Sequence, residues 1–151
     1  MATALDATDH RILAALHEDG RMSMRTLAER LHISRANAYA RVERLRESGV
    51  IRGFRADVDP VASGLGTSAY VTLNVQQADW RQVREALCAL PGIAHIGLVG
   101  GEFDVILLVR ARDNEDLRRL VLDEIQGMEG VLTTRTLLVF EEHEPTPGRP
   151  A

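Results

Sequence analysis

A break at residues 59–67 divides this sequence into two parts that predict different folds. Its first eight residues contain one proline and two glycines, which interrupt any regular helix or strand. Before the break apolar residues recur only at helical spacing, and after it strand and helix patterns alternate. We therefore predict a first domain at residues 1–58, a linker at residues 59–67, a second domain at residues 68–141 and a flexible tail at residues 142–151.

The first domain contains three helical patterns separated by short links. Asp6 or Thr8 is suited to cap the first helix, and Ser23 and Ser34 are suited to cap the other two. Gly49 is suited to end the third in a left-handed conformation. The expected helices are residues 7–18, 24–31 and 35–48, followed by a short strand at residues 50–55. A short helix, a tight turn and a longer helix form a helix-turn-helix unit, and the strand would be its wing.

Positive charge is concentrated in this first domain. The whole chain has a net charge of −4 and contains no lysine. Residues 20–55 hold nine arginines against three glutamates, a net charge of +6, whereas residues 59–151 hold eight arginines against fourteen acidic residues. One interpretation is that these arginines only form a solvated helix face. The coincidence of the helix order with this charge favours DNA binding, because the planar fork of arginine suits phosphate and guanine.

The outward face of the third helix carries the candidate DNA-contacting residues. The N-terminal part of a recognition helix meets base edges, so Arg35 and Asn37 are candidate base readers. Ala36 and Ala40 are small enough for close approach. Phosphate contacts are expected from Arg25, Arg41, Arg44 and, in the wing, Arg52 and Arg55. The predicted DNA-binding set is Arg25, Ser34, Arg35, Ala36, Asn37, Ala40, Arg41, Arg44 and Arg52.

The second domain alternates strand and helix patterns in the order βαββαβ, the ferredoxin-like split unit. The expected strands are residues 69–75, 93–99, 103–111 and 131–140, and the expected helices are residues 79–90 and 113–126. Gly100 and Gly101 predict a tight turn between the second and third strands. The fold class is therefore α+β: an N-terminal winged helix-turn-helix domain and a C-terminal ferredoxin-like βαββαβ domain.

Other kinds of site find little support in the sequence. None of the five histidines pairs with another histidine or a cysteine at metal-ligand spacing, so we expect no metal and no cofactor. Cys88, the single cysteine, is expected to be a buried structural thiol. No catalytic constellation is recognisable, so we do not expect an enzyme. Without a signal sequence or an apolar run of ~20 residues, we expect no membrane contact and a cytoplasmic location.

Motifs along residues 5–141 resemble those of the Lrp/AsnC (feast/famine, leucine-responsive regulatory protein) transcription regulators. In the first domain the matching stretches are Leu5-Asp6-x-x-Asp9-x-x-Ile12-Leu13, Asp19-Gly20-Arg21, Leu27-Ala28-Glu29, Ile33-Ser34, Arg41-Val42-x-x-Leu45 and Ser48-Gly49-Val50-Ile51. In the second they are Val99-Gly100-Gly101-Glu102-Phe103-Asp104, Gly130-Val131 and Thr134-x-Thr136. The order and spacing of these stretches carry the resemblance.

The resemblance implies a DNA-binding domain followed by a regulatory RAM domain. It implies homodimers formed through the sheets of that second domain, assembled further into tetramers or octamers. It also implies small effectors, usually amino acids, in clefts between dimers, lined by the loop before Phe103 and Asp104. The family usually has threonine at the position of Gly100, so the identity of the effector does not carry over.

Chemistry at this loop is compatible with an amino-acid effector. Backbone N–H groups near Gly100 and Gly101 are open to a carboxylate, since no side chain blocks approach. Asp104 is suited to an ammonium group, and Glu102 to a basic side chain. The last strand would complete the pocket from a neighbouring subunit. The predicted effector-binding set is Gly100, Gly101, Glu102, Phe103, Asp104, Thr134 and Thr136. An ordinary hairpin turn and a surface carboxylate are the alternatives.

The sequence therefore predicts an oligomeric, sequence-specific transcription regulator that binds double-stranded DNA and an amino acid. Two other classes stay open: a ligand-binding module whose helix-turn-helix contacts protein, and an enzyme of ferredoxin-like fold. Salt distinguishes the first of these, because an arginine cluster on phosphates loses affinity steeply as salt rises. The enzyme class would require a catalytic group that the sequence does not reveal.

Overall fold

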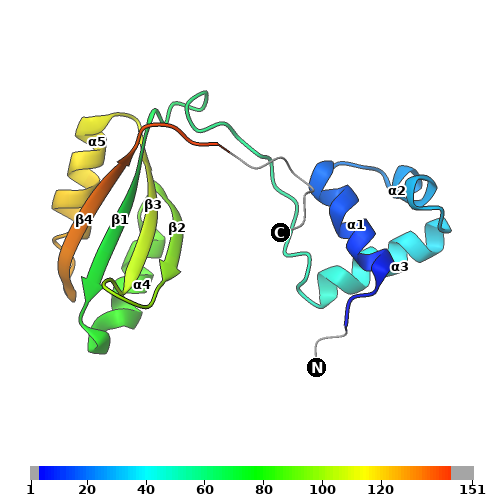
Figure 1. The fold of residues 1–151 in the computed structure, drawn as a ribbon, viewed down its shortest axis with the longest axis horizontal. Coiled ribbons are helices and arrows are strands. Elements are labelled where there is room, and N and C mark those ends of the chain that lie inside the picture. Colours follow the sequence, from blue (N-terminus) through cyan, green and yellow to red (C-terminus); the bar gives the residue numbers. More distant parts are fainter. Residues whose placement is uncertain (1–3, 144–151) are drawn as a thin grey trace. The chain divides into compact units, whose positions relative to one another are not determined.

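The structure, a computed structural model, describes residues 4–143. The chain forms two compact units that meet between Asp57 and Val58, and each is described by itself (Figure 1). None of the helices within residues 4–143 is long and apolar enough to cross a membrane. The tail predicted at residues 142–151 lies outside the described residues from residue 144 onward.

The first unit consists of three helices whose starts are fixed by side-chain caps. Asp6 and Asp9 form a reciprocal capping box at the first helix. Ser23 accepts from the backbone N–H of Thr26 at the second, and Ser34 accepts from that of Asn37 at the third. The helices are α1 (Ala7–Glu18), α2 (Met24–Leu31) and α3 (Arg35–Glu47). These caps satisfy N–H groups that have no partner inside the helix, so local sequence determined the bounds well.

A small aliphatic core joins the three helices. Its buried members are Ile12, Ala15, Leu16, Leu27, Leu31, Val42 and Leu45. Removing each such leucine or isoleucine from water contributes about 1.5–3 kcal/mol, which is the main force holding α3 against α1 and α2. Gly49, at a φ of 75°, ends α3 as predicted.

The predicted wing strand at residues 50–55 is wrong. The backbone after α3 is irregular up to Thr67, apart from a turn at residues 60–64. The N–H of Ile51 donates to the carbonyl of Leu45 at 2.9 Å, which ties the segment to the end of α3. The physical reason is that a strand needs a partner strand, and no neighbouring segment of the described first unit supplies one.

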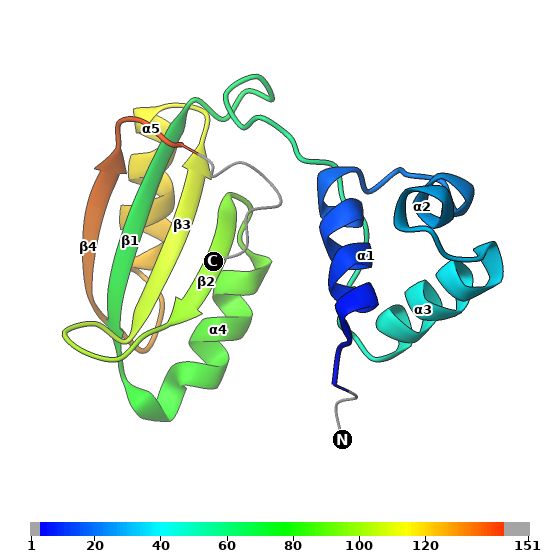
Figure 2. The same ribbon diagram turned by 45° about the vertical axis from the view of Figure 1, so that its right-hand side comes forward.

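The second unit is a four-stranded antiparallel sheet with its helices on one face (Figures 1 and 2). Its elements are β1 (Thr67–Val75), η1 (Gln77–Asp79), α4 (Trp80–Ala89), β2 (Ile93–Leu98), β3 (Val105–Ala111), α5 (Asn114–Arg119), the π-helical segment η2 (Leu120–Ile125) and β4 (Val131–Val139). The strand order is β2-β3-β1-β4. This is the predicted βαββαβ unit, so the α+β fold class is confirmed.

The core of the second unit lies between the helices and one face of the sheet. Alternate residues of β1 and β3 point into it, as their period of two requires. Its members include Ala69, Val71, Leu73 and Val75 from β1, Val105, Leu107 and Val109 from β3, and Val83, Leu87, Leu117 and Ile125 from the helices. Cys88 is exposed rather than buried, because α4 turns Val83 and Leu87 inward and the next residue points to solvent.

The connection between β2 and β3 is longer than the tight turn that two glycines predict. β3 begins at Val105, not at Phe103, and residues 99–104 form the loop. The N–H of Val99 donates to the carbonyl of Asp104, and the N–H of Asp104 donates to the carbonyl of Leu73, each at 3.0 Å. The loop closes on itself and on β1, which takes Phe103 and Asp104 out of the strand.

Candidate functional site

The first turn of α3 presents the predicted base readers on an open surface. Arg35, Ala36, Asn37 and Ala40 are all exposed. The side chain of Arg35 makes no ion pair or hydrogen bond with residues 4–143, so its five N–H donors are free. The hydroxyl of Ser34 caps the helix by accepting from Asn37 N at 3.2 Å. Exposed guanidinium and amide donors beside small alanines are what contact with a base edge requires.

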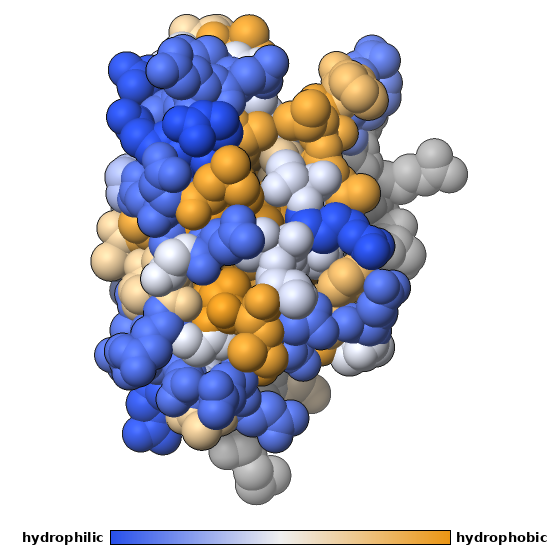
Figure 3. All heavy atoms as spheres, turned by 90° about the vertical axis from the view of Figure 1, so that its left-hand side faces the viewer, coloured by the Kyte–Doolittle hydropathy of each residue, from blue (hydrophilic) through white to orange (hydrophobic). Residues whose placement is uncertain are grey.

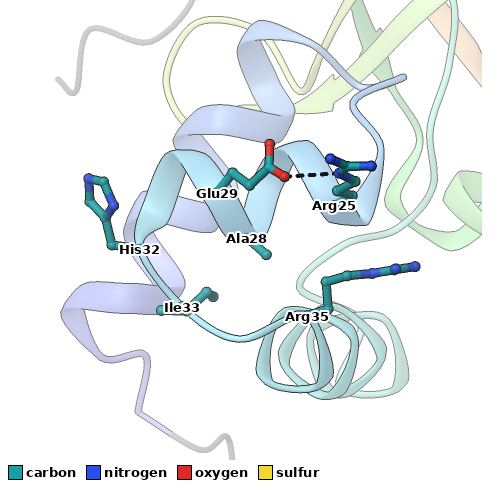
Figure 4. Close-up of a pocket in the computed structure, with 6 residues that line it drawn as sticks. All are labelled: Arg25, Ala28, Glu29, His32, Ile33 and Arg35. Carbon is teal, nitrogen blue, oxygen red and sulfur yellow. Dashed lines mark hydrogen bonds and ion pairs between the residues drawn. The ribbon is translucent and has the colours of Figure 1, made fainter.

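A shallow hollow lies between α2 and α3 (Figure 4). It has a volume of about 480 Å³ and is lined by Arg25, Ala28, Glu29, His32, Ile33 and Arg35. Arg25 and Arg35 lie on the same side of it, one from each helix. Nε of Arg25 donates to Oε1 of Glu29 at 2.9 Å, but both side chains are mostly exposed, so this pair is weak and open to exchange. The hollow leaves Arg25 where it can contact a phosphate, beside the base-reading Arg35.

Two other arginines of α3 are bound to carboxylates of α1. Arg41 NH1 donates to Asp6 Oδ2 at 2.7 Å and to Asp9 Oδ1 at 2.8 Å. Arg44 NH2 lies 2.6 and 2.7 Å from the two carboxylate oxygens of Asp9. The Asp9 side chain is only 1% exposed. We call Asp6, Asp9, Arg41 and Arg44 the α1–α3 charge cluster.

The charge cluster stays ionised and is neutral as a whole. A hydrogen bond from Arg41 holds the pKa of Asp6 below its ordinary value of 3.8. Burial pushes the pKa of Asp9 upward, but hydrogen bonds from Asp6 N and Arg41, with the charge of Arg44, outweigh burial and lower it. The same bonds raise the pKa of Arg41. Arg41 and Arg44 therefore bring no net positive charge to the surface, unlike the phosphate contacts that the sequence predicts for them.

The segment after α3 supplies two further arginines. Arg52 and Arg55 are exposed on irregular backbone rather than on a strand. Neither side chain makes a hydrogen bond or ion pair with residues 4–143. They remain candidates for phosphate contact, with the position of the segment set by the Ile51 hydrogen bond described above.

The β2–β3 loop is fastened to the end of β1. Oδ2 of Asp104 accepts from the N–H of Val75 at 2.9 Å, and Nδ2 of Asn74 donates to the carbonyl of Glu102 at 3.0 Å. Gly100 and Gly101 have open space where a side chain would lie, and Gly101 has a φ of 126°. Asp104 thus has a structural bond on one oxygen, while the glycine backbone remains open to approach.

Arg135 is a residue of this site that the sequence analysis missed. Its guanidinium lies 5.6 Å from the ring centroid of Phe103 and 3.9 Å from the carboxylate of Glu102. The strand register pairs Thr134 with Leu73 and Thr136 with Val71, on the face toward the helices. Successive strand residues point to opposite faces, so Arg135 lies on the face opposite to the two threonines of the motif. Its place between them was the only sign in the sequence that it could reach the loop. One chain alone brings Arg135, not the threonines, to the loop.

The face of the sheet away from the helices is uncovered and apolar at its centre. Tyr70 pairs in register with Leu108 and Leu137, and Thr72 pairs with Ile106. Tyr70 is 41% and Leu137 50% exposed, whereas Ile106 and Leu108 are half-buried. Figure 3 looks from the side where β4 and α5 lie, so it shows the helix-bearing side of this unit rather than the uncovered face, and there apolar residues lie among hydrophilic ones. Within residues 4–143 no group of three or more His, Cys, Asp or Glu side chains is arranged to hold a metal.

Family models match both units. The model of the Lrp/AsnC ligand binding domain matches residues 68–148, and a winged helix-turn-helix DNA-binding model matches residues 5–52. The HTH-type transcriptional regulator AldR of Mycolicibacterium smegmatis is 40% identical over 143 residues, which cover 93% of this chain and 84% of that protein.

Solved structures agree with these matches along nearly the whole chain. A transcriptional regulator of Neisseria meningitidis in complex with L-Met has a TM-score of 0.89 and 28% identity, with 97% of each chain covered. AsnC of E. coli has a TM-score of 0.84 and 25% identity, with 93% of this chain and 95% of that chain covered.

Proposed function

This chain belongs to the Lrp/AsnC family of DNA-binding transcriptional regulators, and we propose that it is an oligomeric, sequence-specific regulator whose DNA binding responds to an amino acid. The observation that carries the proposal is the exposed first turn of α3, where Arg35 and Asn37 stand beside small alanines. Guanidinium and amide groups read base edges, and small side chains allow the helix to approach them.

A sheet-to-sheet homodimer is the assembly that the second unit supports best. Helices cover one face of its sheet, and the other face exposes Tyr70 and Leu137 over half-buried Ile106 and Leu108. A second copy of the same face would bury these side chains by a two-fold operation. The two helix-turn-helix domains of the dimer would then reach two DNA half-sites spaced by about one helical turn or a multiple of it.

Substitution of Leu137 by aspartate tests this dimer. Leu137→Asp places a charge in the middle of the uncovered face, so the mass by light scattering should fall to that of a monomer. Leu122→Asp is the matched control, because Leu122 is 48% exposed on η2, away from that face, and its variant should keep the wild-type mass. A Leu137→Asp variant of unchanged mass would exclude this face as the interface.

The loop at residues 99–104 supports a zwitterionic effector. Gly100 and Gly101 leave backbone N–H groups open to a carboxylate, and Arg135 adds a positive charge beside Phe103. Glu102 is suited to the ammonium group, and Asp104 shares its carboxylate between the loop and a ligand. The Neisseria relative carries L-Met, which makes an amino acid the first class to test. Thr134 and Thr136 would join such a pocket only from another subunit.

Direct DNA binding decides the proposed function. Fluorescence anisotropy with a duplex from the upstream region of the protein's own gene should show binding at about 50 mM salt, where arginine–phosphate contacts are strong. Arg35→Ala should weaken that binding, and Arg118→Ala, a matched change on the second unit, should not. Binding that is absent, or equal on every duplex, would favour the protein-contact class instead.

A thermal-shift screen over the twenty amino acids tests the effector. A ligand that binds only the native protein raises its Tm in proportion to the logarithm of its concentration. Gly100→Val should abolish the shift without changing the Tm of the free protein, because no atom lies within 4 Å of the added side-chain position. No shift with any amino acid would refute this class of effector.

A further inference from the structure

One hydrogen bond fixes the orientation of the Asn37 amide. Nε of Arg41 lies 2.8 Å from Oδ1 of Asn37, one turn earlier on α3. A guanidinium N–H can only donate, so the amide atom that faces it must be the carbonyl oxygen. The amide nitrogen is then the free end of an exposed side chain, and it carries two N–H donors.

Arg41 is itself held in place from the other side. Its NH1 group donates to Asp6 and Asp9 of α1, and the Arg41 side chain is only 23% exposed. Asp9 is 1% exposed and also binds Arg44, so it cannot turn away without leaving charges unpaired. The chain of contacts from α1 through Arg41 therefore keeps the oxygen of Asn37 engaged.

The orientation of an asparagine amide determines which base it reads. Recognition of adenine needs both ends of the amide, since the oxygen accepts from N6 and the nitrogen donates to N7. Guanine offers O6 and N7, which are both acceptors, and it suits a group that presents only donors. An amide oxygen that already accepts from Arg41 has one lone pair left and is held in that direction, which weakens its match to the N6 donor of adenine. Both N–H donors of the amide stay free for the two acceptors of guanine.

We propose that Arg41 is a positioning residue that makes Asn37 a reader of guanine rather than adenine. The inference rests on the proposed function, because it requires that α3 enters the major groove. It assigns Arg41 a role different from phosphate contact, since its charge is neutralised by Asp6 and Asp9. The specificity of α3 is then set partly by α1, through two carboxylates that touch no DNA.

Selection of bound sequences from random duplexes, with the full-length protein, tests the proposal. Loss of base preference in Asn37→Ala identifies the position that Asn37 reads. The wild type should choose guanine there and discriminate against adenine by about tenfold in Kd, as one good contact provides. In Arg41→Leu the amide is free to turn, so the preference should shift to adenine.

Arg44→Leu is the matched control. It removes the other arginine on Asp9 but leaves the bond between Arg41 and Asn37, so the guanine preference should persist despite a similar loss of charge pairing. A cooperative thermal unfolding transition in each variant would show that its helix-turn-helix domain is folded. If Arg41→Leu does not fold, 7-deazaguanine at the same position tests the wild type, because removal of N7 should weaken its binding and leave Asn37→Ala unaffected.

The outcomes separate this inference from the proposed function. Adenine at the Asn37 position in the wild type, or a guanine preference that survives in Arg41→Leu, would overturn the positioning role while sequence-specific binding stands. Failure of 7-deazaguanine to weaken the wild type would do the same. Absence of any selected sequence would contradict the proposed function, and this inference would fall with it.

Discussion

The salt dependence of DNA affinity should be about half as steep as the number of arginines suggests. The sequence offers five phosphate-contact candidates in each helix-turn-helix domain: Arg25, Arg41, Arg44, Arg52 and Arg55. In the structure, Arg41 and Arg44 are neutralised by Asp6 and Asp9, which leaves three. Each neutralised phosphate contributes about −0.9 to the slope of log K against log salt, so a dimer with six contacts should give about −5, and one with ten about −9.

The two slopes differ enough for one titration to separate them. Between 50 and 200 mM salt, six contacts lose about 10³ in affinity and ten lose about 10⁵. Fluorescence anisotropy on one duplex at four or five salt concentrations measures the slope directly. The charge cluster predicts that Arg25→Gln lowers the slope by about 2 in a dimer, whereas Arg44→Gln leaves it nearly unchanged. A wild-type slope near −9, or an equal effect of both substitutions, would show that DNA takes Arg44 from Asp9.

Three further measurements test the fold. Leu87→Ala empties a fully buried site in the second unit and should lower the free energy of unfolding by about 2–5 kcal/mol, read from urea denaturation. A hydrogen bond from Arg112 lowers the pKa of Asp116 to about 2, so its stabilising effect should be complete above pH ~4 and vanish as pH falls toward 2, as an NMR titration would show. Gly130→Ala should be clearly destabilising, since the new methyl would lie 2.7 Å from an aspartate side chain. Gly64→Ala, at a similar positive φ but in open space, should lower the free energy of unfolding by less than Gly130→Ala does.

Local patterns predicted the elements of both units. The caps at Ser23 and Ser34 and the turn at Gly49 determine where helices begin and end, and all three lie within a few residues of the groups they satisfy. The βαββαβ order likewise follows from the spacing of apolar residues along the chain. The wing failed because its pairing depends on a second strand, which no local pattern can guarantee.

The pairings within the candidate DNA surface could not be predicted in the same way. Asp9 and Arg44 are 35 positions apart, and they meet only because α1 and α3 cross at that point. The helical pattern predicts that Arg41 and Arg44 point away from the core, and the sequence alone offers DNA as their partner. The structure supplies a closer partner, the carboxylate of an α1 residue that the capping box already holds in place.

Contacts between residues distant in the sequence also decide how the effector loop can be tested. The charge of Asp104 suits an ammonium group, but its Oδ2 accepts from Val75 N, so removing this carboxylate would disturb the loop and the ligand contact together. Gly100 has no neighbour within 4 Å and can be changed without that effect. Arg135 reaches the loop through the register of β4 with β1. Loss of an effector response in an Asp104 variant would therefore not assign the ligand to Asp104, whereas the same loss at Gly100 would place it at the backbone of this loop.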